Sequence, residues 1–227
     1  MKILLISLLV FCFWQQTAAQ SGRVGQFAIW NPLQNKKARF EAGYKRHLLW
    51  HQRNGDIWDW YGWYFISGGR SGRFIDATFG HQWADFDAAV HPAGDARDNA
   101  RNVGPAAVFE TAWKFVVLPE LSTPGKSGLN SKYLRMLTLK TTGLQKATPA
   151  IRKAMQRYSP SVRTFQTLQV ADGGDLNELT ILIGFERFAE LQQTADVVEF
   201  FADPAIFQAV KAELLVFRKD LSLFPAH

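Results

Sequence analysis

Two histidines, His47 and His51, stand four residues apart in a segment whose apolar residues recur with helical spacing. At about 100° per residue they share one helix face with Phe40, Tyr44 and Leu48, the face that packs on the rest of the protein. A buried imidazole must find hydrogen-bond partners, and a neutral imidazole near pH 7 is a suitable general base. The pair therefore predicts a catalytic or ligand-binding role.

The sequence leaves three interpretations of this pair open. The histidines can be ordinary core residues, they can line a functional pocket, or they can be two metal ligands. For the third interpretation the sequence identifies no third ligand. The residues between the pair, Leu48, Leu49 and Trp50, also lack the glutamate of a zinc-protease helix. We therefore predict His47 and His51 as catalytic residues and predict no metal site.

Polar residues elsewhere in the same half of the chain could complete a pocket. Asp76 interrupts an apolar strand, where it either pairs with Arg73 or a histidine or lies on a sheet face wetted by the cavity. His81 ends that strand and either enters the cavity or covers the strand end in water. Residues 95–102 alternate in charge, as on a solvated helix face or on a lid over the pocket. On these grounds the predicted ligand-binding residues are Tyr44, Trp60, Tyr64, Asp76 and His81.

The elements that must position these residues recur twice along the chain. Residues 119–131, rich in proline, glycine and serine, are typical of a linker between residues 20–118 and residues 132–227. Each half shows the order strand, helix, strand, strand, helix, strand, with matching glycine pairs about 105 residues apart. The expected strands are residues 26–30, 58–66, 73–79, 108–118, 133–140, 162–170, 178–185 and 215–224. The expected helices are residues 35–53, 95–103, 149–159 and 204–214, the third capped by Thr148 with Pro149 at its first position.

This order is that of the split βαβ unit, a four-stranded antiparallel sheet with helices on one face. Residues 58–66 are aromatic on both faces, as in a strand that is buried on both sides. We therefore predict an α+β fold of two tandem ferredoxin-like βαββαβ units. Their antiparallel sheets are expected to face each other as an intrachain α/β barrel, with the helices outside. The alternative is two separate units that each dimerise with another molecule.

The two halves differ in a way that bears on function. The apolar stripe of the second half's first helix contains no histidine, and the second half contains no tryptophan. That stripe reads Ala147, Ile151, Ala154, Met155 and Tyr158. The same helix can therefore pack without imidazoles, so we expect the first half to hold the site and the second to be structural.

Residues 1–19 have the features of a secretory signal peptide, with Lys2, a short apolar run and a cleavage site expected after Ala19. A membrane anchor is the alternative, but the run is shorter than the ~20 residues that span a bilayer. We therefore expect a secreted or periplasmic protein with no membrane attachment after cleavage. Because the single cysteine, Cys12, lies in this leader, thiol catalysis and cysteine-bound metals are excluded from the mature chain. The net charge of +6 is scattered and does not indicate nucleic-acid binding.

The order of elements and the internal repeat, over nearly all of residues 24–224, resemble the dimeric α/β-barrel superfamily of ferredoxin-like units. Here two units are fused in one chain. That superfamily includes antibiotic-biosynthesis monooxygenase-like proteins, haem-degrading monooxygenases, EthD-like proteins and polyketide cyclases. In such families a pocket between the sheet and the helices of one unit is often lined by histidine, tyrosine, tryptophan and asparagine. The resemblance thus implies Trp30, Asn31 and Trp63 as further ligand-binding residues.

Three functions follow as expectations. The first is an exported protein that binds a small planar or aromatic molecule, as a monomer or homodimer. If it is an enzyme, it would be a cofactor-independent monooxygenase, cyclase or lyase. The second is a haem-binding or haem-handling protein with one of the two histidines as axial ligand. The third is a non-catalytic interaction protein whose aromatic residues are only packed core.

Overall fold

The computed structural model describes residues 23–125 and 128–225, so the predicted signal peptide lies outside the described residues. The strands are β1 (Val24–Pro32), β2 (Tyr61–Phe65), β3 (Phe74–His81), β4 (Ala107–Val117), β5 (Tyr133–Thr141), β6 (Thr164–Asp172), β7 (Glu178–Phe185) and β8 (Phe207–Phe217). The α-helices are α1 (Lys37–Arg53), α2 (Pro92–Asn102) and α3 (Leu144–Tyr158), and short 3₁₀ segments include η3 (Phe188–Thr194) and η4 (Val197–Phe201). None of the helices in these residues is long and apolar enough to cross a membrane.

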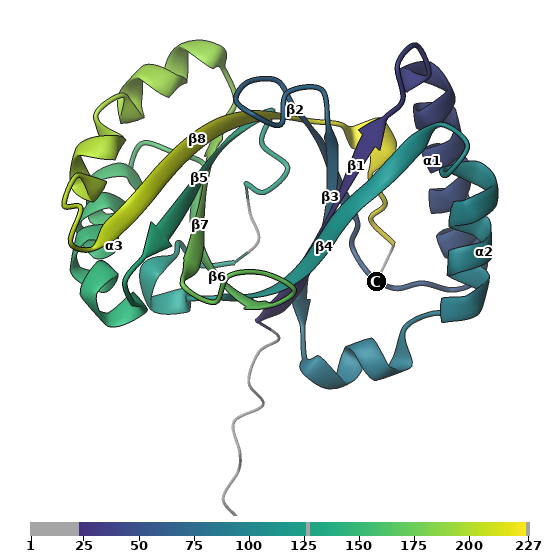
Figure 1. The fold of residues 1–227 in the computed structure, drawn as a ribbon, viewed down its shortest axis with the longest axis horizontal. Coiled ribbons are helices and arrows are strands. Elements are labelled where there is room, and N and C mark those ends of the chain that lie inside the picture. Colours follow the sequence, from purple (N-terminus) through teal and green to yellow (C-terminus); the bar gives the residue numbers. More distant parts are fainter. Residues whose placement is uncertain (1–22, 126–127, 226–227) are drawn as a thin grey trace, which may run out of the picture.

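The strands form one closed antiparallel barrel in the order β1-β3-β2-β8-β5-β7-β6-β4. Figure 1 shows α1 and α2 on one side of this barrel and α3 on the opposite side. Strands β2 and β8 join the two units on one side, where Trp63 is paired with Phe217. Strands β4 and β6 join them on the other, where Phe115 is paired with Val170. This confirms the predicted α+β fold of two ferredoxin-like units, and closure removes the exposed sheet edges.

Alternate residues of β2 belong to two different apolar clusters, which explains why this strand is aromatic on both faces. Trp63 points into the barrel and packs with side chains of both units, such as Phe27 and Leu182. The next residue, Tyr64, lies in the cluster beneath α1 together with Phe40. A third cluster fills the space between α3 and the second sheet. The barrel interior is therefore a shared core, and each unit has its own helix layer outside it.

The sequence prediction was wrong near the end of the chain. The sequence predicts a helix over residues 204–214 and a last strand over 215–224, but the structure has β8 over Phe207–Phe217. Alanine, lysine, glutamate and leucine in this segment favour a helix locally. However, β8 lies between β2 and β5 and closes the barrel, so pairing on both sides outweighs the local preference. Residues 186–201 supply the helical turns of this region as η3 and η4.

The start of α3 also differs from the prediction. The helix begins at Leu144, five residues before Pro149, so Pro149 lies inside it rather than at its first position. Thr148 does not cap the helix, because its hydroxyl donates a hydrogen bond of 2.9 Å to the carbonyl oxygen of Leu144. The predicted apolar stripe is correct, because Ala147, Ile151 and other members of it are buried.

Helices α1 and α2 approach each other closely at two glycines. A Cβ atom on residue 43 of α1 would overlap the carbonyl oxygen of Asn102 in α2. A Cβ atom on residue 94 of α2 would lie 2.9 Å from the indole of Trp50 in α1. Glycine permits this close approach of the two backbones. The inner face of α2 is thereby held against the face of α1 that carries the histidines.

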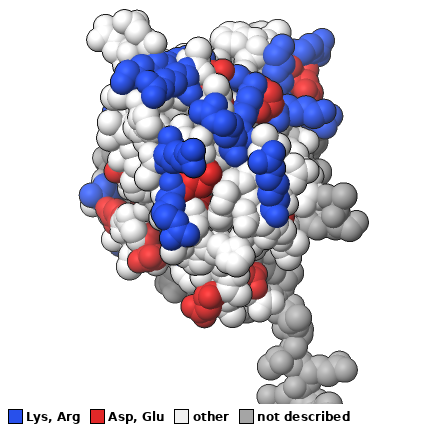
Figure 2. Space-filling view, turned by 90° about the vertical axis from the view of Figure 1, so that its right-hand side faces the viewer, with Lys and Arg blue, Asp and Glu red and all other residues white. Residues whose placement is uncertain are grey.

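The outer face of the same two helices is basic. Figure 2 looks onto this side of the molecule and shows lysine and arginine side chains gathered over it, with fewer acidic ones between them. The exposed basic residues of the two helices are Lys37, Arg39, Lys45, Arg46, Arg53, Arg97 and Arg101. A surface of one sign raises the local concentration of ligands of the opposite sign.

Candidate functional site

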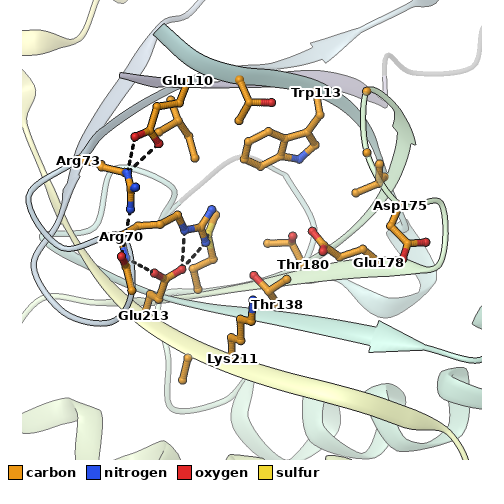
Figure 3. A pocket seen from close by; sticks show the side chains of 18 residues that line it. Arg70, Arg73, Glu110, Trp113, Thr138, Asp175, Glu178, Thr180, Lys211 and Glu213 are labelled. Atoms are coloured by element: carbon orange, nitrogen blue, oxygen red, sulfur yellow. Dashed lines mark hydrogen bonds and ion pairs between the residues drawn. The ribbon is translucent and has the colours of Figure 1, made fainter. Parts of the chain in front are cut away.

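A cavity of about 730 Å³ lies at one end of the barrel, where the β2–β3 and β6–β7 turns come together. Figure 3 shows that its arginines are held by carboxylates: Arg73 is paired with Glu110, and Arg70 with Glu213. Because these charges already neutralise each other, they join strands of the barrel rather than present an unpaired charge to a ligand. The histidines of α1 do not line this cavity.

A second cavity arises from a row of small side chains across the first sheet. The row runs through β4, β1 and β3 as Ala112, Ala28 and Asp76. The corresponding row of the second sheet runs through β8, β5 and β7 as Ala212, Leu137 and Ile181. Large aliphatic side chains therefore fill the space beneath α3 at this level, whereas part of the space beneath α1 stays open.

That space is a cavity of about 290 Å³ between the first sheet, α1 and α2. Alanines of β1 and β4 form its floor, and two indoles and Phe109 lie along its sides. Residues of α1 and α2 close it from above. The predicted site residues on its wall are Trp30, Tyr44, His47, His51, Trp60 and Asp76. The structure thus brings together six of the ten residues that the sequence singles out.

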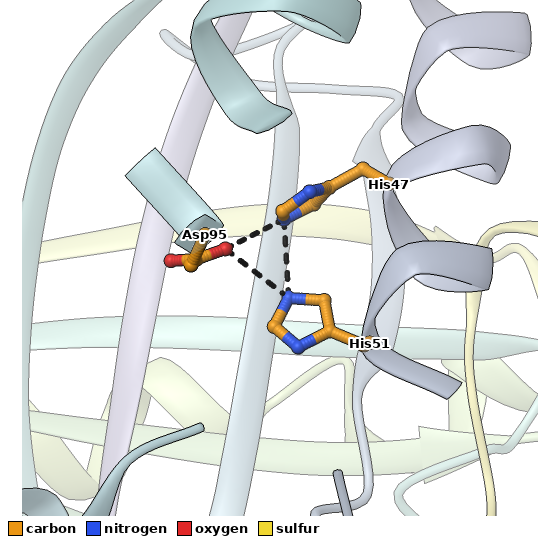
Figure 4. A group of neighbouring side chains, drawn as sticks. All are labelled: His47, His51 and Asp95. Carbon is orange, nitrogen blue, oxygen red and sulfur yellow. Dashed lines mark hydrogen bonds and ion pairs between the residues drawn. The ribbon is translucent and has the colours of Figure 1, made fainter. Parts of the chain in front are cut away.

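The polar end of this cavity is a cluster of two imidazoles and one carboxylate, shown in Figure 4. The Nε2 atoms of His47 and His51 lie 3.1 Å apart. Oδ1 of Asp95, on α2, lies 3.3 Å from Nε2 of His47 and 3.4 Å from Nε2 of His51. Both histidines are buried, while the side chain of Asp95 is 35% exposed. The cluster therefore lies between the cavity and the solvent.

The far side of each imidazole faces another carboxylate. Nδ1 of His47 lies 2.9 Å from Oδ2 of Asp98, and Nδ1 of His51 lies 2.7 Å from Oδ2 of Asp56. Asp56 also accepts hydrogen bonds from the indole of Trp60 and the backbone of Trp58, both at 2.9 Å. The hydrogen bond to Asp98 holds the ring of His47, and Asp56 lies within ion-pair distance of Nδ1 of His51. Both carboxylates favour a proton on the Nδ1 atom that they face.

The two imidazoles titrate differently although they touch. Burial lowers the pKa of His47, and the charge of His51 lowers it further, against the opposing effect of Asp98 and Asp95. Burial acts in the same direction on His51, but its contacts with Asp56 and Asp95 outweigh it and raise its pKa to about 9. Near neutral pH the pair therefore carries one positive charge, on His51, and His47 is neutral.

Asp76 is a buried carboxyl group on the cavity floor. Its Oδ2 accepts a hydrogen bond of 2.9 Å from the indole nitrogen of Trp30. Burial raises the pKa of Asp76 to about 7, although hydrogen bonds from Trp30 and Tyr44 oppose the shift. Burial and the proximity of Asp76 raise the pKa of Tyr44 well above its usual value. Asp76 can therefore present either a donor or an acceptor to a ligand near neutral pH.

The other four predicted ligand-binding residues lie elsewhere. Trp63 points into the barrel, where its ring stacks on that of Tyr61 with centroids 5.6 Å apart. Tyr64 is buried beneath α1 but does not line the cavity, and Asn31 is exposed. His81 lies against Trp58, with ring centroids 4.1 Å apart, in a separate pocket. Strand alternation sends Trp63 to the opposite side of the sheet from the histidines.

Three residues that sequence reasoning missed contact the two imidazoles: Asp56, Asp95 and Asp98. Residues 95–102 have the composition of a solvated helix face. In the structure, residues of α2 line the cavity beneath α1, which is nearer to the alternative interpretation of this segment as a lid over the pocket. Asp95 and Asp98 are three residues apart on a helix, a spacing that matches the four-residue spacing of the histidines. The matching spacing of the two aspartates and the two histidines was the signal available in the sequence. Only the contact between α1 and α2 shows that these side chains meet.

Comparison with known proteins relates this chain to others through its structure alone. No protein-family model and no curated protein sequence matches it. A proposed monooxygenase from Lactobacillus acidophilus is similar in structure, with a TM-score of 0.62 and 10% identity over 89% of this chain and 96% of that one. A chlorite dismutase from Candidatus Nitrospira defluvii gives a TM-score of 0.57 and 11% identity over 88% and 93%.

A haem-binding protein from Thermus thermophilus gives a TM-score of 0.56 and 9% identity over 88% of this chain and 92% of that one. At such low identity these likenesses show the fold and leave the function open. The chain therefore has the dimeric α/β-barrel fold, with both ferredoxin-like units fused in one polypeptide.

Proposed function

We propose that this chain is an exported protein that binds a small, largely planar molecule in the cavity beneath α1. The observation that carries the proposal is the cavity of about 290 Å³ that joins an aromatic chamber to the His47–His51–Asp95 cluster. Pockets for small ligands begin at roughly 300 Å³ and combine apolar walls with a few polar groups, as this one does. The leader sequence supports export.

The lining favours a planar ligand with a polar edge. Trp30, Trp60 and Phe109 offer flat aromatic surfaces, against which a ring can stack. Asn99 supplies a buried carbonyl oxygen that has no hydrogen-bond partner among the described residues, so it can accept a hydrogen bond from a ligand. Asp76 lies on the floor of the same cavity. A ring with a hydroxyl or amino group meets both requirements.

The imidazole pair gives this pocket a means of moving protons. The lowered pKa keeps His47 neutral near pH 7, so its imidazole can act as the acceptor of a proton from a ligand hydroxyl group. Removing a proton from a phenol-like molecule makes its ring electron-rich, which is the shared first step of oxygenation, cyclisation and lyase reactions on activated aromatics. Proton transfer on a planar phenol is therefore the reaction class that the pocket favours.

Haem does not fit the residues as they stand. The cavity is at the small end of the range for ligand pockets, and a haem macrocycle with its propionates needs more room. The Nε2 atoms of the two histidines also lie only 3.1 Å apart. A porphyrin whose iron approached one Nε2 atom would therefore overlap the other imidazole. Protein purified from haem-supplemented cells should therefore show no Soret band.

Calorimetric titration with 1-naphthol, a planar phenol, tests the binding proposal. We expect saturable binding at one site in the wild-type protein and its loss in Ala28→Leu, which fills the cavity floor. The matched variant Thr138→Leu places the same side chain in the 730 Å³ cavity at the barrel end and should leave binding unchanged. No saturable binding to the folded wild-type protein, or loss in Thr138→Leu rather than in Ala28→Leu, would overturn the proposal.

A further inference from the structure

We propose that Nε2 of His47, Nε2 of His51 and Oδ1 of Asp95 bind a single divalent transition-metal ion. This inference goes beyond the proposed function, because it concerns the cluster itself and does not depend on the identity of the small molecule. The sequence suggests two ligands at most, and the fold supplies the third from a different helix.

The three donor atoms have the spacing that a bound ion requires. A triangle with sides of 3.1, 3.3 and 3.4 Å has corners about 1.9 Å from its centre. One ion slightly outside this plane can therefore lie about 2.1 Å from all three atoms, the usual bond length from zinc to imidazole nitrogen or carboxylate oxygen. The ligands need no rearrangement beyond a few tenths of an ångström.

The carboxylates behind the imidazoles prepare both rings for a metal. Asp98 lies 2.9 Å from Nδ1 of His47, and Asp56 lies 2.7 Å from Nδ1 of His51. When each ring carries a proton on Nδ1 only, both Nε2 atoms can bind an ion, so an ion that binds here displaces the second proton of His51. Metal-binding histidines commonly donate their second N–H to a carboxylate in this way, which fixes the tautomer and increases ligand basicity.

Other hydrogen bonds hold the carboxylates of α2. The side-chain amide of Asn99 donates to Oδ1 of Asp95 at 3.3 Å, and that of Asn102 donates to Oδ1 of Asp98 at 2.9 Å. Arg46 in turn donates to the side chain of Asn102 at 2.9 Å, which connects α1 to α2. The candidate ligands thus lie on two rigid helices whose separation is set by the contact at Gly43.

The donor set indicates the kind of ion. Two imidazoles and one carboxylate suit zinc, iron, cobalt or manganese, whereas calcium and magnesium prefer oxygen ligands. Three carboxylates surround the two imidazoles, so a divalent ion also offsets their negative charge. Three protein ligands on one side leave further coordination positions open, as in catalytic rather than structural metal sites. Because the ligands line the cavity, those positions would be accessible to the bound molecule.

The corresponding helix of the second unit argues for a specific site in the first. By the order of the buried positions, His47 and His51 correspond to Ala154 and Tyr158 of α3. Tyr158 donates a hydrogen bond of 2.7 Å to Asp196 and cannot serve as a comparable ligand. Packing in this fold does not require imidazoles at these positions, so the cluster in unit one is an addition to the fold.

The test uses the untagged full chain, freed of metal with a chelator and titrated with Zn²⁺ by calorimetry and with Co²⁺ by visible absorption. We expect one ion per chain and Co²⁺ bands of a site with nitrogen and oxygen ligands. His51→Ala and Asp95→Ala should each weaken binding by about 100-fold or more, and Asp98→Asn by about 10-fold. The third ligand, His47, is replaced by glutamine, because the glutamine amide can still donate a hydrogen bond to Asp98 and maintain folding. His47→Gln should also weaken Zn²⁺ binding.

The matched control is His91→Asn, which removes an exposed histidine next to α2 and should leave the affinity unchanged. The inference is overturned if the folded wild-type protein binds no Zn²⁺, or if the His51 and Asp95 variants bind it as tightly as the wild-type protein does. Binding of 1-naphthol by the metal-free protein is measured in parallel. If 1-naphthol binds and Zn²⁺ does not, the metal site is rejected and the small-molecule proposal stands; the reverse result rejects only the latter.

Discussion

Ala28 of β1 lies directly across from Asp76 of β3 in the first sheet, where the second sheet pairs Leu137 with Ile181. Both residues of the second pair are completely buried beneath α3. Replacing two large aliphatic side chains by a methyl group and a carboxyl group leaves the space beneath α1 unfilled. This one difference between otherwise similar sheets decides which unit has a cavity next to its first helix.

The first prediction compares substitutions at Ala28 of β1 and Leu137 of β5, which occupy corresponding positions in the two sheets. Leu137→Ala should lower the free energy of unfolding by about 2–5 kcal/mol, because it creates a void in a filled core. Ala28→Leu should change it by less than about 1 kcal/mol, because the added carbon atoms enter space that already exists. Urea unfolding followed by tryptophan fluorescence measures both. Equal costs for the two substitutions would contradict the assignment of the cavity.

The second prediction concerns the contact between α1 and α2. Helix propensity alone would make Gly43→Ala stabilising by about 1 kcal/mol. We expect the opposite sign, a loss of about 1–3 kcal/mol, because the new methyl group would overlap the carbonyl oxygen of Asn102. Urea unfolding gives the sign directly. A more stable Gly43→Ala protein would show that the helices do not pack this closely.

The third prediction concerns the pH dependence of stability through Asp76. Its pKa is about 7 in the folded protein, above its usual value of 3.8, so the folded state holds the proton more tightly than the unfolded state does. This contribution is complete below pH 4 and is lost as the pH rises through 7. The wild-type protein should therefore lose stability relative to Asp76→Asn between pH 4 and pH 7. Urea unfolding of both proteins at several pH values measures the difference, and a constant difference would refute the raised pKa.

The fourth prediction concerns an ion pair that connects the end of β8 to α1. Arg218 donates two hydrogen bonds to Glu41, at 2.8 and 2.9 Å, and with Lys37 it lowers the pKa of Glu41 to about 2, against the opposing effect of burial. Arg218→Gln should cost about 1–2 kcal/mol near pH 7. This cost should shrink as the pH falls from 4.5 towards 2, where Glu41 takes up a proton.

Lys37→Gln is the matched control for this ion pair. Lys37 contacts the same carboxylate at 3.1 Å but its side chain is 60% exposed, so its loss should cost no more than about 0.5 kcal/mol. Thermal unfolding of both variants at pH 7 and pH 3 checks the prediction. A larger effect for Lys37→Gln than for Arg218→Gln would contradict the assigned geometry.

Much of the fold could be predicted because its signals are local. The repeat of turns and apolar segments indicates two ferredoxin-like units, and the doubly apolar segment at 58–66 indicates a strand buried on both faces. The error at β8 shows the limit of this reasoning. A strand that closes a barrel is held by partners from both units, and its own residues need not show the alternation of an isolated strand.

The sequence by itself determined that His47 and His51 share the buried face of a helix and that the second unit has no equivalent pair. Spacing along one helix is enough for that conclusion, because helix geometry is fixed. Only the tertiary structure decided that Asp56, Asp95 and Asp98 meet these imidazoles and that Trp63 does not. Such contacts depend on how close α2 comes to α1 and on which side of the sheet each strand residue faces. Both are set by packing between segments far apart in the chain.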